Sequence, residues 1–332
     1  MKTTTKRDPA KTLVVGVGSA LMDILLLEEE RFLASSGLKK GGMIHAENST
    51  VIEALLSQSK AKQSIVPGGS ACNTIVGISS LGGQARFVGK RGNDDLGMQF
   101  EASLRKHNVE PILFTSDSPT GRVLSIITPD SQRSMFTFLG ASSEMKPEEI
   151  LPAHFENAAV VHIEGYLLFN EALLLASLKA AKKSGALISL DLASYTVVEA
   201  SMHILDDLIN DYVDILIANE DEARAFTGLT SEEKALEILA KKADIAVLKI
   251  GKRGSLVGHN GKTVKIDRMG TGVAVDTTGA GDLWAAGFLY GLVNGYSIEA
   301  CGKLGSACGW EVCQVIGASI PDEGWKRIEK YK

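Results

Sequence analysis

The sequence lacks an apolar run of about 18 residues, the length that a membrane-spanning helix needs, and we expect no membrane partner. Cysteine is scarce: the chain has four, none of them in a Cys-x-x-Cys pair, which argues against a zinc site and a redox-active pair. A large excess of charge of one sign is also missing, since the chain has 35 basic and 40 acidic residues. This balance excludes a broadly basic nucleic-acid-binding protein, and we expect no nucleic-acid partner.

The apolar stretch at residues 13–27 superficially resembles the core of a signal peptide. Gly16, Gly18 and Asp23 interrupt it, and no small-residue cleavage site follows. Three of the four cysteines lie in one apolar, helix-like stretch, where a free thiol packs as a small hydrophobic group. These features favour a reducing compartment, and we expect a cytoplasmic protein.

Short apolar runs alternate with amphipathic segments along most of the chain. Continuous runs of Val, Ile and Leu are typical of parallel strands covered on both faces, so the pattern predicts an α/β fold with a mostly parallel sheet. The expected strands are residues 12–18, 85–90, 159–163, 186–191, 214–218 and 243–250. The expected helices are residues 51–59, 95–106, 171–184 and 231–241.

Two segments, residues 22–47 and 112–140, break this alternation. Both have the pattern of extended strands with turn residues, without a helix of their own. We expect them to pair into a small β-sheet that lies beside the parallel sheet as a lid. The expected organisation is a large α/β domain of residues 1–21, 48–111 and 141–332 and a small β lid of residues 22–47 and 112–140.

The most specific motif is Asp276-Thr277-Thr278-Gly279-Ala280-Gly281-Asp282, and a helix-like segment follows it. A Gly-Ala-Gly turn at a helix start exposes backbone N–H groups at the positive end of the helix dipole, which suits an anion such as a phosphate. A carboxylate at this place, Asp282, is suited to orient a hydroxyl group that attacks the phosphate and to act as its base. The structural alternative is that Asp282 is only a favourable acid in a helix's first turn.

A second glycine-rich motif is Gly68-Gly69-Ser70-Ala71-Cys72-Asn73, and an apolar stretch follows it. Paired glycines at a helix start let a ligand approach the backbone closely, and the Asn73 side chain both donates and accepts hydrogen bonds. An ordinary loop that leads into a helix fits the same residues.

The segment Asn219-Glu220-Asp221-Glu222 directly follows a predicted strand. An amide and acids at the carboxyl end of a parallel strand suit Mg²⁺, held directly or through water. The same spacing is typical of a capping box, in which Asn219 and Glu222 satisfy backbone N–H groups and no metal is needed. The two interpretations are compatible, since a cap can leave one carboxylate oxygen free.

Asp23 is a lone acid within the apolar run Leu21-Met22-Asp23-Ile24-Leu25. Burying such a carboxylate costs free energy unless it is paired. One carboxylate can accept two hydrogen bonds, which matches a vicinal diol. A structural acid with a partner in the protein is the alternative.

The motifs and their order resemble the ribokinase/PfkB family of carbohydrate and nucleoside kinases, over about residues 13–321. The segment from Asp276 to Asp282 looks like the family's carboxyl-terminal signature, and Gly68-Gly69 with Asn73 looks like its amino-terminal glycine signature. Asn219 and Glu222 look like its Asn-x-x-Glu magnesium motif. The resemblance implies a ribokinase-like three-layer sandwich with a small β lid, and an enzyme that transfers a phosphoryl group to an alcohol group.

The resemblance also implies roles for single residues. Asp282 would be the catalytic base, and the backbone amides from Gly279 through Ala280 and Gly281 to Asp282 would form the anion hole. The hydroxyl groups of the phosphate acceptor would be held by Asp23, Gly68, Gly69 and Asn73. Mg²⁺ and phosphate would be organised by Asn219 and Glu222, with the metal bound mainly through water.

On the nucleotide side, Lys249-Ile250-Gly251-Lys252-Arg253-Gly254 resembles the family's Thr-Leu-Gly-x-x-Gly loop, with Lys249 in place of the usual small hydroxyl residue. The resemblance implies that ATP is bound by Lys249, Gly251, Gly254 and Thr277. Many members also use K⁺. Asp276 and Thr278 match part of that site, which the backbone near Gly317 and Ser319 would complete.

Residues 18–24, 37–43 and 132–135 look most like the adenosine-kinase-like bacterial branch, in which the lid supplies hydrophobic contacts to a base. Phe136, Phe138 and Phe169 are the candidates for these contacts. Arg133 would face substrate or phosphate, or it would be a solvated charge on the lid.

The expected function is transfer of the γ-phosphoryl group of ATP to a primary hydroxyl of a ribose-containing acceptor, adenosine or a related nucleoside. ATP and Mg²⁺ are the expected cofactors, and the need for K⁺ stays open. A monomer or homodimer is the expected assembly. A kinase of a free or phosphorylated sugar, ribokinase- or fructokinase-like, stays open as an alternative. So does a non-catalytic sugar- or nucleoside-binding regulator, although a pure binder needs no base such as Asp282.

Overall fold

Continuous apolar runs form the buried strands of a large sheet in the computed structural model, which describes residues 8–40, 42–130 and 132–332. Its nine strands lie in the order β14-β13-β12-β11-β10-β9-β1-β5-β6. Neighbours from β12 to β6 are parallel, and the β12-β13-β14 edge is antiparallel. The strands are β1 (Leu13–Val17), β5 (Ala85–Gly92), β6 (Val109–Ser116), β9 (Ala158–Glu164), β10 (Leu187–Asp191), β11 (Ile215–Asn219), β12 (Ile245–Lys249), β13 (Ser255–His259) and β14 (Lys262–Ile266).

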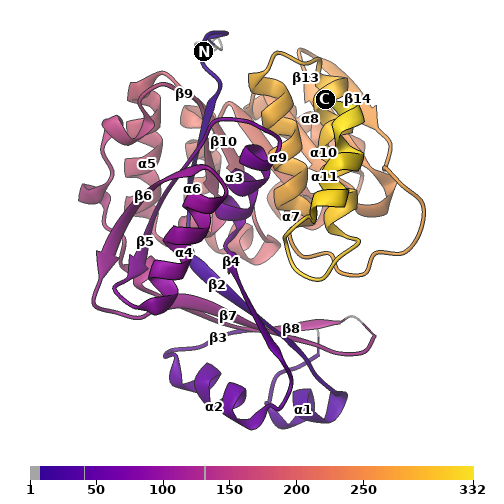
Figure 1. Cartoon of the computed structure of the whole chain (residues 1–332). Helices are drawn as coiled ribbons and strands as arrows, with labels where there is room; N and C mark the ends of the chain where they lie inside the picture. Colours follow the sequence, from indigo (N-terminus) through magenta and orange to yellow (C-terminus); the bar gives the residue numbers. More distant parts are fainter. Residues whose placement is uncertain (1–7, 41, 131) are drawn as a thin grey trace.

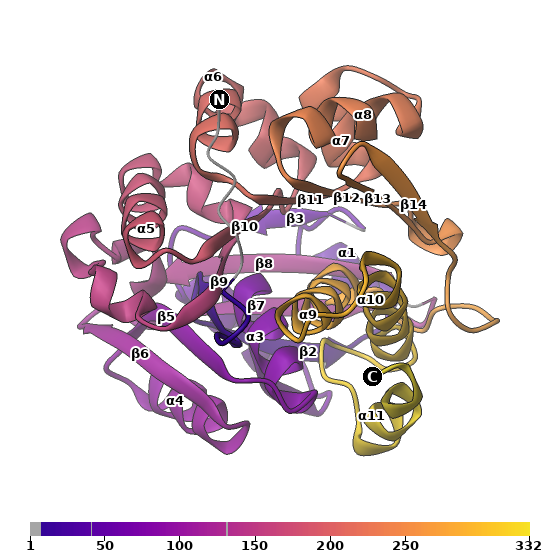
Figure 2. The same ribbon diagram turned by 90° about the horizontal axis from the view of Figure 1, so that it is seen from above.

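Helices cover both faces of the large sheet, as the continuous apolar strands require (Figure 2). One core cluster joins the sheet to α5 (Glu171–Ser184), α6 (Tyr195–Tyr212), α7 (Glu220–Thr227) and α8 (Glu232–Lys242). A second cluster, on the other face, joins it to α3 (Ser70–Ser80), α4 (Asp95–Lys106), α9 (Ala280–Val293), α10 (Ile298–Val312) and α11 (Asp322–Ile328). Within the described ranges, no helix combines the length and the apolar character that crossing a membrane requires.

A small sheet lies below the large one in Figure 1. Its five strands have the order β3-β8-β7-β2-β4. They are β2 (Leu21–Leu27), β3 (Met43–His45), β4 (Gln63–Gly68), β7 (Thr120–Ile127) and β8 (Arg133–Gly140). Helices α1 (Glu30–Ser35) and α2 (Thr50–Gln58) pack on one face through a third cluster that includes Ile24, Leu33, Ile52, Leu124 and Phe136. Short 3-10 segments complete the chain at Ala141–Glu144, Pro147–Glu149, Pro152–Phe155, Gly165–Phe169, Gly251–Arg253 and Glu329–Tyr331.

The chain passes between the two sheets at glycine-rich points. Gly18 to Ala20 connect β1 to β2, and β4 runs through Gly69 directly into α3. In the β2–β4 pairing, Leu21 lies opposite Gly68, which brings the motif Gly68-Gly69 to the junction of the two sheets. A β-carbon on Gly69 would lie 2.4 Å from the carbonyl oxygen of Ser19, and its φ of +96° is unfavourable for other residues, so this crossing requires glycine.

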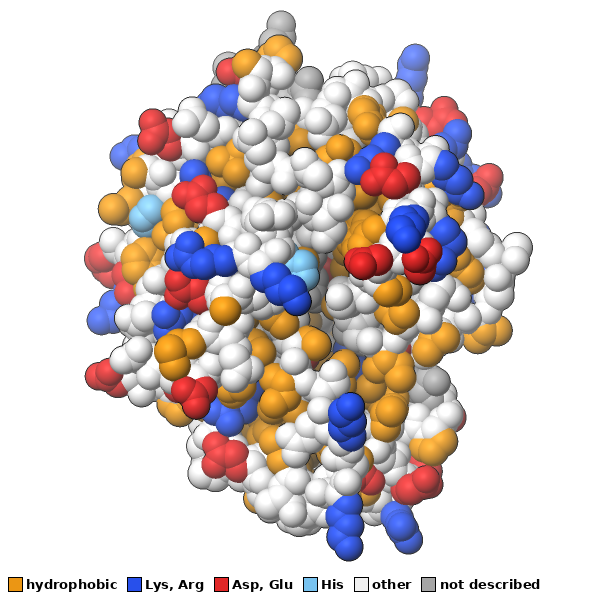
Figure 3. Space-filling view, in the orientation of Figure 1, with side chains coloured by type: hydrophobic (Ala, Val, Ile, Leu, Met, Phe, Trp, Pro, Cys, Tyr) orange, Lys and Arg blue, Asp and Glu red, His pale blue; other side chains and the backbone are white. Residues whose placement is uncertain are grey.

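The α/β class, the mostly parallel sheet and the second small sheet agree with the prediction from sequence. The predicted helices at residues 95–106 and 171–184 match α4 and α5 in both bounds. The prediction that residues 22–47 contain no helix is wrong, because α1 lies within them. On the face seen in Figure 3, Lys and Arg side chains are interspersed with Asp and Glu, as the balanced composition predicts.

The strands of the small sheet also differ from the expected segments. Residues 112–116 were expected in the lid, but they belong to β6, which pairs with β5 in the large sheet. Residues 63–68 were expected in the large domain, but they form β4, which pairs with β2. β4 is a mostly exposed edge strand that contains Pro67, so it shows no apolar alternation in the sequence. The division into two domains that move relative to each other stays a prediction.

Candidate functional site

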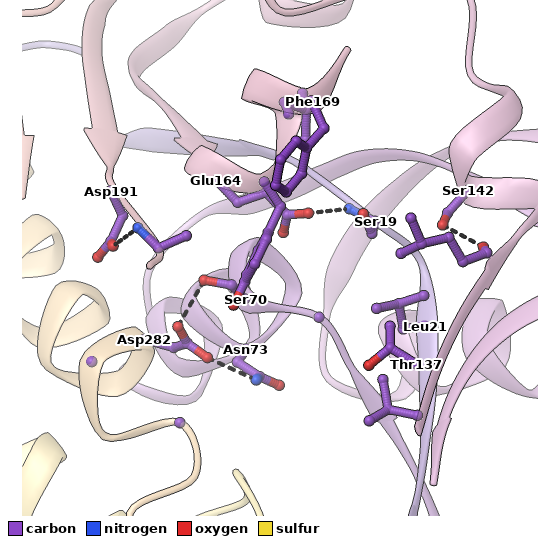
Figure 4. A pocket seen from close by; sticks show the side chains of 18 of the residues that line it. Ser19, Leu21, Ser70, Asn73, Thr137, Ser142, Glu164, Phe169, Asp191 and Asp282 are labelled. Atoms are coloured by element: carbon purple, nitrogen blue, oxygen red, sulfur yellow. Dashed lines mark hydrogen bonds between the residues drawn. The ribbon is translucent and has the colours of Figure 1, made fainter. Parts of the chain in front are cut away.

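A cavity of about 880 Å³ lies where the carboxyl ends of the parallel strands meet the small sheet. Both sheets and the start of α9 contribute to its lining (Figure 4). The sequence-predicted residues that line it are Asp23, Gly69, Asn73, Arg133, Asn219, Glu222, Lys249, Thr277, Thr278, Gly279, Ala280, Gly281 and Asp282. Four predicted residues, Gly68, Gly251, Gly254 and Asp276, are not among the lining residues.

Asp282 is held by two side chains from the first turn of α3. The Ser70 hydroxyl donates to its Oδ1 at 2.8 Å, and Asn73 Nδ2 donates to its Oδ2 at 2.9 Å (Figure 4). Burial raises the pKa of Asp282, and the bonds from Asn73 and Ser70 oppose that rise because they stabilise the ionised form. The carboxylate is therefore fixed in orientation at the start of α9.

The glycine turn before Asp282 begins α9. Gly279 is the N-terminal cap of this helix and has the left-handed φ of +71°, which favours glycine. The first N–H groups of a helix have no intrahelical acceptor, so those of this turn can face an anion. The Ala280 N–H is an exception, because it donates to the Thr277 carbonyl at 3.2 Å.

Asp23 is buried on the cavity face of β2, with 9% of its surface exposed. A β-carbon on Gly68 would lie 2.4 Å from the Asp23 carboxyl carbon, so the glycine makes room for the carboxylate. Burial raises the pKa of Asp23 to about 6, and Arg133 opposes this rise while Asp282 adds to it. Gly68 thus supports Asp23 without itself lining the cavity.

Arg133, on β8, reaches from the small sheet to the turn before α9. Its guanidinium donates to the hydroxyl of Thr278, and Arg133 also lowers the pKa of Asp276. The alternative that Arg133 is a solvated charge is therefore wrong: the side chain is partly buried and joins the two halves of the cavity.

The capping box at the start of α7 is present as the spacing predicts. Asn219 Oδ1 accepts from the Asp221 and Glu222 N–H groups at 2.9 Å, and Glu222 Oε2 accepts from the Asn219 N–H at 2.8 Å. Burial and the charge of Asp191 raise the pKa of Glu222 to about 7. Among the described residues, no three His, Cys, Asp or Glu side chains are grouped as a metal site. Asn219 Nδ2 donates to Glu222 Oε1 at 2.6 Å, so both oxygens of this carboxylate already accept from Asn219, and the expectation that one of them stays free is wrong. The residues that are present therefore fit a Mg²⁺ ion held largely by phosphate oxygens and water.

Asp276 ties the turn to a distant loop rather than facing the cavity. Its Oδ1 accepts from the N–H of Thr278 at 3.0 Å and from its hydroxyl at 2.7 Å. Its Oδ2 accepts from the N–H of Gly317 at 2.8 Å. Asp276, Thr278 and Gly317 of the expected K⁺ site thus lie together, although protein donors already occupy the carboxylate.

Three acids that line the cavity were missed from the sequence: Glu164, Glu171 and Asp191. Glu164 and Asp191 end β9 and β10, and both line the cavity. Glu164 accepts from the N–H groups of Ser19 at 2.8 Å and Ala71 at 3.0 Å, and burial raises its pKa to about 6. The sequence pattern that could have predicted Glu164 and Asp191 is an acid at the end of a buried strand, because ligands bind at the carboxyl edge of a parallel sheet.

The expectation for two of the three phenylalanines is wrong. Met135, Thr137 and Leu139 of β8 line the cavity, so the alternate residues Phe136 and Phe138 face the cluster under α1 and α2. Phe169 does line the cavity and keeps 59% of its surface exposed.

Comparison with known proteins gives one consistent result. The model of the family described as "pfkB family carbohydrate kinase" matches residues 12–324 of this chain. A solved structure of a probable sugar kinase protein from Rhizobium etli has a TM-score of 0.88 and 31% identity, and covers 96% of this chain and 98% of its own. The adenosine kinase from Sinorhizobium meliloti has a TM-score of 0.87 and 32% identity, covering 97% of this chain and all (100%) of its own.

A curated relative points the same way. The nucleoside kinase of Methanocaldococcus jannaschii is 28% identical over 274 residues, which is 80% of this chain and 86% of the relative. The sandwich of helices around a mostly parallel sheet, with its small second sheet, is thus the fold of these kinases.

Proposed function

The chain belongs to the pfkB family of carbohydrate kinases, which transfer a phosphoryl group to an alcohol group of a sugar or nucleoside, and on this premise we propose an ATP-dependent nucleoside kinase. Its acceptor is adenosine or a closely related nucleoside, and the group that is phosphorylated is the primary hydroxyl of the ribose. The similarity to an adenosine kinase, at 32% identity over nearly the whole chain, supports this choice of acceptor.

One observation about the cavity carries the proposal. Beside Asp23, the small sheet lines the cavity with the apolar side chains of Leu21, Val123, Met135 and Leu139, which offer an apolar wall, and with the polar side chains of His45, Ser125 and Thr137. A carboxylate that accepts two hydrogen bonds suits the ribose diol, and an apolar wall beside it suits a flat base. A free sugar, which carries hydroxyl groups on all sides, gains less than a base from the apolar part of this lining.

The chemical step needs alignment more than covalent chemistry, because phosphoryl transfer passes through a loose transition state. Asp282 orients the acceptor hydroxyl and takes its proton, and Ser70 and Asn73 fix the direction of the carboxylate. The amides of the turn Gly279–Asp282 stabilise charge on the transferring oxygens, with the Ala280 amide contributing least because of its bond to Thr277. Mg²⁺ bound to the nucleotide phosphates would neutralise charge, and Asn219 with Glu222 would orient its water ligands.

The remaining predicted residues have one of two roles: they bind the nucleotide, or they help to close the cavity. Thr277 and the loop with Gly251 and Gly254 bind the nucleotide, although that loop lies outside the cavity in this conformation. Asp276 and Thr278 fix the turn through their hydrogen bonds, and with the backbone near Gly317 they would contribute to a K⁺ site that supplies positive charge to the turn. The small sheet acts as a lid, and the contact of Arg133 with Thr278 fastens it over the phosphates and excludes water.

A sugar kinase is the second candidate, because the probable sugar kinase from Rhizobium etli matches at 31% identity with a TM-score of 0.88. A panel of acceptors separates the two. With ATP and Mg²⁺, we expect ADP release with adenosine to exceed release with ribose, fructose and fructose 6-phosphate by about 10² in kcat/KM, because the base adds binding that a free sugar lacks. Each acceptor is assayed with K⁺ and without it. Faster turnover of a free sugar than of every nucleoside would overturn the assignment.

Asp282→Asn keeps the size of the side chain and the start of α9 but removes the proton acceptor. We expect kcat to fall by about 10²–10⁴ while ATP affinity and melting temperature change little. Asp95→Asn is the matched control, because Asp95 is an exposed acid in the first turn of α4, outside the cavity. If kcat of Asp282→Asn stays within about threefold of wild type, Asp282 is not the base.

The raised pKa of Asp23 predicts that acceptor binding weakens at low pH. Only the ionised carboxylate accepts two hydrogen bonds from a diol, and a group with a pKa of about 6 loses its charge below that pH. The acceptor Kd, measured by calorimetry without nucleotide, should be constant above about pH 7 and rise about tenfold per pH unit below about 6. Asp23→Asn should bind weakly at every pH, without this rise. A wild-type Kd that is flat between these values would contradict the diol contact.

A further inference from the structure

Lys249 has a position that the resemblance to a nucleotide loop does not explain. It is the last residue of β12, paired in register with Asn219 of β11, so it shares the carboxyl edge of the sheet with Glu164 and Asp191. Its side chain is 15% exposed and lines the cavity. A lysine largely removed from solvent at this edge is unusual, because taking an ammonium group out of water costs free energy unless charges nearby compensate it.

The ammonium group lies against the glycine turn of α9. A β-carbon built on Gly281 would be 2.9 Å from Lys249 Nζ, so the cation nearly touches the backbone of the expected anion hole. Asp191 Oδ2 accepts from Nζ at 2.8 Å, and the N–H of Ala193 donates to the other oxygen of Asp191 at 3.0 Å. Gly281 therefore leaves room for a cation at this turn, where the charges of Lys249 and Asp282 act on each other.

The ammonium group is charged and can still bind an anion. Burial lowers the pKa of Lys249, but the carboxylates of Asp191 and Glu222 outweigh it and raise the pKa above its ordinary value. An ammonium group has three N–H donors, of which the bond to Asp191 uses one. Contact with a second anion does not require this ion pair to break.

Most of the charged side chains that line the cavity are acidic, so a cation there affects how an anionic ligand binds. Six carboxylates line it, and Lys249 and Arg133 are the two Lys or Arg side chains among the lining residues of the described chain. The carboxylates are Asp23, Glu164, Glu171, Asp191, Glu222 and Asp282. A triphosphate that enters so acidic a cavity needs positive charge at the point where its terminal phosphate meets Asp282.

We propose that Lys249 is a catalytic residue whose ammonium group binds the phosphoryl group in transfer, and that Asp191 is the positioning residue that aims it. This inference rests on the proposed kinase function and deepens it. The lysine contacts a phosphoryl oxygen at Gly281, opposite the hydroxyl that Asp282 orients, and stabilises the charge that the transition state spreads over these oxygens. It forms and breaks no covalent bond.

The competing explanation is that Lys249 only neutralises Asp191. Breaking a buried ion pair by removing one partner destabilises a protein, whereas removing both charges is often harmless. The double variant Lys249→Met/Asp191→Asn therefore separates the two roles. If the pair is structural, the double variant recovers both the melting temperature and kcat. If Lys249 binds phosphate, the melting temperature recovers and kcat does not.

The test compares wild type, Lys249→Met, Asp191→Asn and the double variant in kcat, melting temperature and nucleotide affinity. We expect kcat of Lys249→Met and of the double variant to fall by about 10²–10³, the usual effect of losing one charge-stabilising donor. Calorimetry with a non-hydrolysable ATP analogue and with ADP reports the contact without turnover. We expect wild type to bind the analogue more tightly than ADP. In both variants without Lys249, the ratio of the two affinities should fall about tenfold.

Lys90→Met is the matched control. Lys90 is also a buried lysine in an ion pair, with Glu149 Oε1 at 2.8 Å, but it lies outside the cavity. It should lower the melting temperature and leave kcat and the nucleotide preference unchanged. Should Lys249→Met not fold, the double variant carries the same comparison.

The inference about Lys249 is overturned if the double variant regains kcat within about threefold of wild type, or if the analogue preference is the same in wild type and the variants. Failure of the kinase proposal looks different: wild type then turns over no acceptor of the panel. In that case the calorimetric comparison still decides whether Lys249 binds a terminal phosphate.

Discussion

The hydrogen bonds that join α3 to α9 at Asp282 are the constraint on which the site depends. Ser70 and Asn73 hold the carboxylate, and the hydroxyl of Thr74 donates to the Asp282 carbonyl at 3.1 Å. The two helices can meet so closely because a β-carbon on Gly77 would lie 2.7 Å from Ala286. The first turns of α3 and α9, each preceded by glycine, are distant in sequence but meet at the carboxylate of Asp282, at the carboxyl edge of the parallel strands.

The electrostatics of the cavity follow from the same convergence. Parallel strands end at one edge, so Glu164 and Asp191, which end β9 and β10, add to a common negative field. Burial raises the pKa values of Asp23 and Glu164 to about 6 and that of Glu222 to about 7. Backbone amides, Lys249 and Arg133 compensate part of this charge. The arrangement suits an anionic ligand that brings its own metal ion, as a nucleotide triphosphate does.

The features that were predicted correctly from the sequence are those that depend on residues close together in the chain. The apolar runs of β9 and β11, the capping box of Asn219 and the glycine turn before Asp282 depend on neighbouring residues, and each appears as expected. What failed depends on partners far away in the chain. β6 joined the large sheet and the exposed strand β4 joined the small one through tertiary pairing. Phe136 faces the helices rather than the cavity because of strand register, and Glu164 gained its role through contacts with Ser19 and Ala71.

The central claim is that this cavity transfers the terminal phosphoryl group of ATP to a primary hydroxyl of a nucleoside. Phosphorus NMR of wild type with ATP, Mg²⁺ and adenosine tests it most directly, because it identifies the bond that forms. The claim predicts a new phosphate monoester in a one-to-one ratio with ADP, whose proton-coupled signal is a triplet from the adjacent methylene group. A doublet from a secondary alcohol, or release of inorganic phosphate in place of the ester, would contradict it.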